Sequence, residues 1–177
     1  ADPTVQQTLP NPRGLCVCGD YIYLYAYGYD AVEAIIPERM EVLGRLRVDG
    51  LIDVSCAAGQ PWALAMPFGV HHLEADLSGA RRSFEFSGPP LSKMSGVGPE
   101  VWIVDFMSGI YRIGGESGEK QKITLKADGI GYNLIGVAVV EQAVWVFGSA
   151  AEHKALLRVE PESGEVLQTI VLRNSLD

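Results

Sequence analysis

The sequence predicts an all-β fold in which a unit of about 40 residues repeats four times. Three tryptophans, Trp62, Trp102 and Trp145, lie 40 and 43 residues apart, and Tyr23 lies 39 residues before the first of them. A second series, of alternating apolar residues, ends at positions 48, 86, 125 and 172. Period-two alternation indicates strands. The nearest helix candidate, 33–40, is interrupted by Pro37.

Each unit contains four short apolar segments in the same order. The first lies at 15–17, 52–54, 91–94 and 135–137, and the second holds the aromatic position at 21–24, 61–64, 101–104 and 144–147. The third lies at 32–36, 70–73, 110–113 and 156–159, and the fourth is the second series described above. Turns at 76–79, 116–119 and 162–165 begin with acidic or serine residues and contain a late glycine, which supplies a positive φ; the turn at 37–40 is irregular.

Four antiparallel strands in about 40 residues are typical of a β-propeller blade. A single sheet of this kind cannot cover both of its apolar faces, so neighbouring sheets must stack. A β-sandwich would need too many strands for 177 residues. We therefore predict an N-terminal segment, 1–12, followed by four blades at 13–50, 51–88, 89–131 and 132–177.

The N-terminal segment adds a prediction about assembly. Residues 4–9 resemble the outer strand at 166–171 and would form an orphan outer strand. Three alternatives follow: part of a ring of six to eight blades, a half-ring that assembles with another chain, or a closed four-bladed ring with the segment as a strap.

Composition limits the partners and the compartment. Acidic residues outnumber basic ones by 22 to 14, and the net charge of −8 argues against nucleic acid and anionic membranes as partners. No apolar run approaches the roughly 18 residues of a membrane span. Three cysteines do not suggest a disulfide framework, so we expect small buried apolar side chains and slightly favour the cytoplasm over export.

Five tyrosines alternate along the second segment of the first unit and its extension: Tyr21, Tyr23, Tyr25, Tyr27 and Tyr29. Tyrosine is enriched at protein interfaces because its ring gives contact area and its hydroxyl a polar tip. This row is the preferred interface candidate, and the alternative is packing against the neighbouring blade. The expected partner is a protein or a second copy of the chain.

His72 and Glu74 are two apart on a strand and are the weak metal-ligand candidates. The alternative is that both are exposed polar residues of a third strand. No other pattern points to catalysis, so we expect no catalytic residue and no cofactor. The chain is interpreted as a non-catalytic module for protein–protein interaction.

Two units carry a resemblance to known repeats. Residues 135–138, 144–146 and 157–166 resemble a blade of streptogramin-lyase-like and YVTN-type propellers, whereas 91–98, 101–104 and 109–112 are similar to a tectonin repeat. The first resemblance implies a metal-dependent enzyme whose histidine and carboxylate ligands come from late blades, a pattern from which His72 and Glu74 depart. The second implies a carbohydrate-binding module in which the three tryptophans would stack on sugars.

Overall fold

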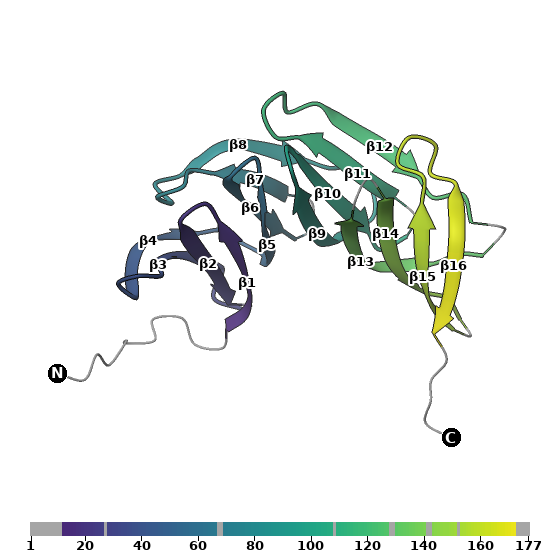
Figure 1. Ribbon diagram of the computed structural model, residues 1–177, viewed down its shortest axis with the longest axis horizontal. Helices are drawn as coiled ribbons and strands as arrows, with labels where there is room; N and C mark the ends of the chain where they lie inside the picture. The colour runs from purple at the N-terminus through teal and green to yellow at the C-terminus, as the bar shows by residue number, and fades with distance from the viewer. Residues whose placement is uncertain are drawn as a thin grey trace, which may run out of the picture. The chain divides into compact units, whose positions relative to one another are not determined.

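The computed structural model describes residues 12–26, 28–66, 69–107, 109–127, 130–140, 143–151 and 153–172. These residues form sixteen β-strands and no helix (Figure 1), which confirms the all-β prediction. The predicted orphan strand at 4–9 lies outside the described residues. Within the described residues, no helix is long and apolar enough to span a membrane.

The strands form four separate four-stranded antiparallel sheets, each of which follows the chain as a simple meander. The first sheet is β1 (Pro12–Cys18), β2 (Tyr21–Ala26), β3 (Ala31–Ile36) and β4 (Glu41–Arg47), and the second is β5 (Leu51–Ala57), β6 (Gln60–Ala65), β7 (Gly69–Leu73) and β8 (Ala80–Glu85). The third is β9 (Leu91–Val97), β10 (Glu100–Asp105), β11 (Gly109–Gly114) and β12 (Lys120–Thr124), and the fourth is β13 (Asn133–Val140), β14 (Ala143–Ser149), β15 (Lys154–Val159) and β16 (Val166–Leu172).

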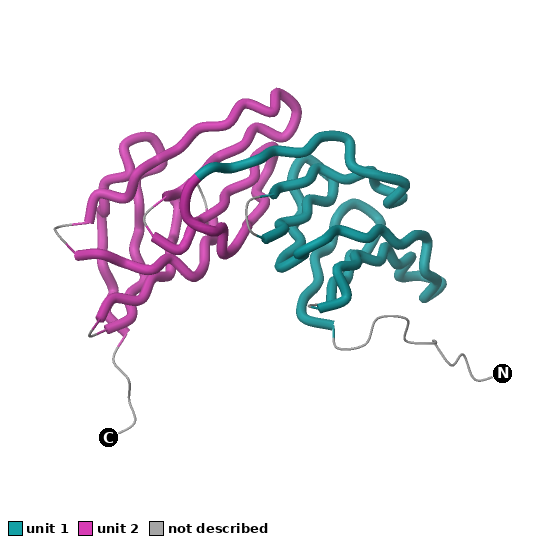
Figure 2. Tube along the Cα trace, turned by 180° about the vertical axis from the view of Figure 1, so that it is seen from behind, with its two compact units in different colours: residues 1–87 teal, residues 88–177 magenta. Residues whose placement is uncertain are grey.

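The chain divides into two compact units, residues 1–87 and 88–177 (Figure 2). In the first unit, one face of β1–β4 packs on one face of β5–β8. Tyr23, Tyr25 and Val32 meet Val54 and Ala63 in a single buried cluster. The Tyr23 hydroxyl donates a hydrogen bond of 2.8 Å to the carbonyl of Ala75, in the β7–β8 turn.

The second unit is built in the same way from β9–β12 and β13–β16. Trp102 and Val104 of β10 pack in one cluster with Val146 and Leu157 of the fourth sheet. The hydroxyl of Ser92, on β9, lies 3.2 Å from the carbonyl oxygen of Val104 and 2.9 Å from that of Leu134 on β13. Ser92 therefore links the inner strands of the two sheets.

The expectation for the cysteines is wrong for two of the three. Cys18 on β1 and Cys56 on β5 form a disulfide with a Cα–Cα distance of 5.3 Å, whereas Cys16 is free. The two are 38 residues apart, close to one repeat, so their strands become neighbours only when the first two sheets stack. A disulfide is typical of oxidising compartments, which weighs against the cytoplasmic expectation.

The hairpin turns follow the expected chemistry, with one correction. Gly118 and Gly164 adopt positive φ values of 70° and 73°. In the turn at 76–79 it is Leu77, with φ 59°, and not Gly79 that adopts the left-handed conformation. Leu77 is buried in the core of the first unit, and this burial offsets the unfavourable backbone conformation.

Candidate functional site

The tyrosine-rich strand serves mainly the interior of the first unit. Tyr23 and Tyr25 are only 1% and 5% exposed, and Tyr21 contacts the Tyr23 ring edge-on at a centroid distance of 6.4 Å. Strand β2 ends at Ala26, so the predicted strand extension is wrong and Tyr29 lies in the following turn, 51% exposed. The position of Tyr27 lies outside the described residues.

The core position of Tyr23 also sets its ionisation. Burial, followed by the nearby groups Cys16, Tyr21 and Asp76, raises the pKa of Tyr23 to about 12. Tyr23 and Tyr25 thus pack against the second sheet, as in the alternative weighed from the sequence. The interface role of the tyrosine row stays a prediction, for which the exposed Tyr29 is the accessible member.

His72 and Glu74 have separate partners. The His72 ring is buried and stacks on Trp62 at a centroid distance of 4.5 Å, so the expectation of an exposed side chain is wrong for it. Burial lowers the pKa of His72, and the nearby Arg81 and Arg82 add to this effect. The Glu74 carboxylate pairs with Arg81 at 2.9 Å. Among the described residues, no group of three or more His, Cys, Asp or Glu side chains could hold a metal ion.

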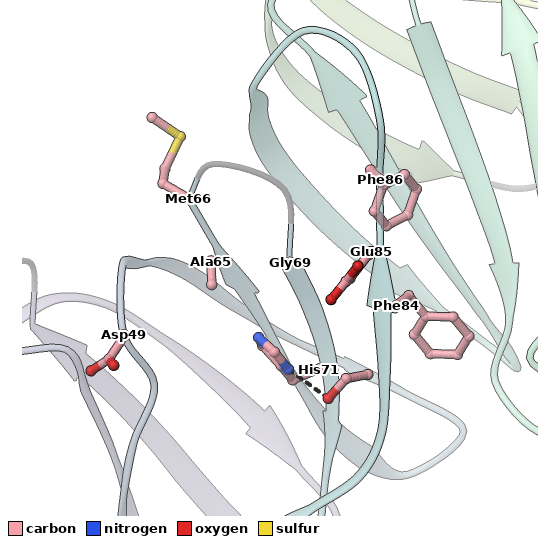
Figure 3. A pocket seen from close by; sticks show the side chains of 9 residues that line it. Asp49, Ala65, Met66, Gly69, His71, Phe84, Glu85 and Phe86 are labelled. Carbon is pink, nitrogen blue, oxygen red and sulfur yellow. Dashed lines mark hydrogen bonds between the residues drawn. The ribbon is translucent and has the colours of Figure 1, made fainter.

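The neighbouring histidine, His71, lines a pocket of about 340 Å³ in the first unit (Figure 3). Its Nδ1 atom lies 2.9 Å from the hydroxyl of Ser83, and burial lowers its pKa. The carboxylates of Asp49 and Glu85 also line the pocket, and Asp49 pairs with Arg47 at 2.8 Å. The pocket therefore offers a neutral imidazole, a hydroxyl and carboxylates to a small polar ligand.

A second pocket, of about 310 Å³, lies between the two sheets of the second unit. Arg112 lines it, and its guanidinium lies 5.5 Å from the centroid of Trp102. Arg112 also contacts Gln121 at 2.5 Å and, across the pocket, Glu162 at 2.8 Å. Its role is to join the third and fourth sheets with an ion pair over an aromatic ring.

The three tryptophans differ in exposure. Trp62 and Trp102 are buried, whereas Trp145 on β14 is half-buried. Sequence reasoning did not select Arg112 or its counterpart Arg158 as candidates. The signal available in the sequence was an arginine that follows the tryptophan of its unit, ten residues later for Arg112 and thirteen residues later for Arg158.

No protein-family model matches the chain, and no curated protein matches it. Its structure is similar to hydrazine synthase of Kuenenia stuttgartiensis (TM-score 0.78, 14% identity, covering 96% of this chain and 51% of that chain). It is also similar to the dihydro-heme d1 dehydrogenase NirN (TM-score 0.71, 11% identity, covering 92% of this chain and 37% of that chain). A third similar structure is BamB of Moraxella catarrhalis (TM-score 0.60, 8% identity, covering 88% of this chain and 50% of that chain). The chain thus spans about half the length of these proteins or less.

These likenesses establish the fold. The four sheets are β-propeller blades, and the predicted fold class is confirmed.

Proposed function

We propose that this β-propeller chain is a non-catalytic module that binds protein through the outward faces of its first and last blades. The supporting observation is where exposed large apolar side chains lie within strands. Among the described residues, eleven exposed large apolar side chains lie in strands. Ten of them belong to β1–β4 or β13–β16, and Val97 is the exception. The ten are Leu15, Val17, Val42, Leu43, Ile135, Val140, Leu167, Ile170, Val171 and Leu172.

The first-blade face is the side of β1–β4 opposite to Tyr23 and Tyr25. It is defined here by Leu15, Val17, Ile22 and Leu24, which are cross-strand neighbours. Leu15 and Val17 are 63% and 65% exposed, which is unusual for apolar residues in a strand of a sheet. Contiguous apolar surface of this kind marks interaction sites.

The last-blade face is the side of β13–β16 opposite to the core of the second unit. It is defined here by Trp145, Phe147, Leu156, Arg158, Gln168, Ile170 and Leu172. Propeller blades stack sheet on sheet, so a face of this composition fits the face of another sheet. Carbohydrate binding through the tryptophans has less support, because Trp62 and Trp102 are buried.

A photoreactive amino acid tests this function. Placed at Val17 or Ile170 in the full chain, it should give discrete protein adducts on irradiation in cells. Placed at the exposed Thr124 on β12, it should not. Replacing Leu15 with Ser on the first-blade face, or Phe147 with Ser on the last-blade face, should reduce the adduct from the same face at least several-fold. Equal adduct yields from Val17, Ile170 and Thr124 would refute the proposal.

A further inference from the structure

We propose that the last-blade face of one copy of the chain binds the first-blade face of a second copy, so that two chains join head to tail at two identical contacts. The proposal rests on the proposed function and names its partner. It follows from a set of residues that recurs at equivalent strand positions in different blades.

In the second unit, the fourth sheet packs on one face of the third sheet. Trp102, Arg112 and Gln121 are paired in register across β10, β11 and β12 and form a line on one face of the third sheet. The fourth sheet covers this line, and Glu162 in its β15–β16 turn binds Arg112 at 2.8 Å. The other covering side chains that line the pocket are Val139, Val144 and Pro161.

The same line of residue types recurs on the fourth sheet, on the face that no other described sheet of the second unit covers. Trp145, Arg158 and Gln168 are paired in register across β14, β15 and β16, in the same order of residue types. Arg158 and Gln168 are exposed, whereas Arg112 and Gln121 are only partly so. None of the ion pairs found among the described residues involves Arg158.

The first blade carries residues equivalent to those with which the fourth sheet covers the third. In the fourth sheet the cover is the cross-strand pair of Val139 and Val144, and in the first sheet the equivalent pair is Val17 and Ile22.

The turns match in the same way. Val144 pairs with Val159, and Ile22 pairs with Ile35. Val159 and Ile35 are each followed, two residues later, by the dipeptide Pro-Glu. This dipeptide is 161–162 in the fourth blade and 37–38 in the first. The exposed Glu38 therefore occupies the position from which Glu162 reaches Arg112.

The contact inside the first unit shows that this geometry is general. There Tyr23 stands at the tryptophan position, and its hydroxyl binds the carbonyl of Ala75. Ala75 follows Leu73 by two residues, and Leu73 is the equivalent of Val159 because His72 pairs with Trp62 as Arg158 pairs with Trp145. In both units, a side chain on the aromatic face of one blade thus contacts the third-to-fourth strand turn of the next blade: Tyr23 contacts Ala75, and Arg112 contacts Glu162.

Charge complementarity points to a second copy as the partner. Arg158 on the last-blade face and Glu38 beside the first-blade face have opposite charges, whereas two last-blade faces would place arginine against arginine. Contacts between unlike faces close into a ring when the rotation permits it.

Charge reversal in purified protein tests the pairing by sedimentation equilibrium. Wild type should form a dimer. Arg158→Glu and Glu38→Arg should each weaken the dimer about tenfold or more, because each homodimer then has like charges at both contacts. Mixing the two variants should restore the dimer, since one contact is then native and the other reversed. Glu119→Arg, in the β11–β12 turn, is the matched control and should leave the dimer unchanged.

Each alternative result is informative. A wild type that stays monomeric at all concentrations overturns the second-copy proposal; adducts at Val17 or Ile170 with a different protein would then leave the proposed function standing. If the mixture of the Arg158→Glu and Glu38→Arg variants does not form a dimer, the head-to-tail contact is also overturned. If photo-crosslinking gives no face-specific adduct and wild type is monomeric, both proposals fail.

Discussion

The two units solve the same problem, joining adjacent blades, with different chemistry. In the first unit, a covalent bond between Cys18 and Cys56 links the inner strands β1 and β5. In the second unit, the inner strands β9 and β13 are linked by the hydroxyl of Ser92. The second unit also has an ion pair between Arg112, on β11, and Glu162 in the β15–β16 turn.

A common apolar stacking pattern therefore leaves the choice of cross-link open. Both units bury an apolar cluster between their sheets. The cross-links differ in how they respond to conditions: a disulfide is lost to reductant, and an ion pair is screened by salt. The two units should therefore fail under different treatments.

Reduction should have the largest effect, and only on the first unit. The disulfide closes a loop of 38 residues, and its loss should lower the free energy of unfolding of this unit by about 4 kcal/mol. Urea denaturation with and without reductant measures the change, and hydrogen exchange assigns it to β1–β8. Cys16→Ala, which leaves the disulfide intact, is the control. An unchanged urea midpoint after confirmed reduction would contradict the prediction.

Alkaline pH should also destabilise the first unit. Burial, followed by the charge of Asp53, raises the pKa of Cys16 to about 12, and Tyr23 has a similarly raised pKa. Both groups keep their protons in the folded state but lose them when unfolded, above about pH 9 to 10. The stability they contribute is present below pH 9 and is lost as the pH rises towards 12.

Thermal denaturation between pH 8 and 12 measures this loss. The pH dependence should become shallower in Cys16→Ala and in Tyr23→Phe. The same slope in both variants and in wild type would show that other groups are responsible.

Ser92→Ala should destabilise the second unit by about 1–3 kcal/mol. The substitution removes the hydroxyl between β9 and β13, so the buried carbonyl oxygens of Val104 and Leu134 lose this partner. Urea denaturation measures the change, and Ser163→Ala in an exposed turn is the matched control. A Ser92→Ala change no larger than that of the control would show that the hydroxyl does not link the sheets.

Arg112→Met should have the smallest effect, about 1 kcal/mol in the second unit. It removes the contacts with Glu162 and Gln121 but keeps apolar contact with Trp102, and Arg112 is partly exposed. High salt should reduce the difference between the variant and wild type in a denaturation experiment, because Glu162 is exposed to solvent. Loss of several kcal/mol, independent of salt, would show that packing and not charge dominates.

The blades could be predicted from the amino-acid sequence alone. Alternation of apolar residues fixes strands, and the spacing of Tyr23, Trp62, Trp102 and Trp145 fixes their repetition, because both signals are local or periodic. Turn chemistry was also readable, except where Leu77 replaces glycine in the left-handed conformation.

Which face of each strand is covered could not be predicted, because it depends on how the sheets stack. Alternation gives a strand two faces but does not say which neighbour packs on each. This is why Tyr23 and Tyr25 proved to be core, why Cys18 and Cys56 were not recognised as a pair, and why Arg158 was overlooked. Each of these properties depends on the stacking of one blade on the next, which brings together residues about one repeat apart in the sequence.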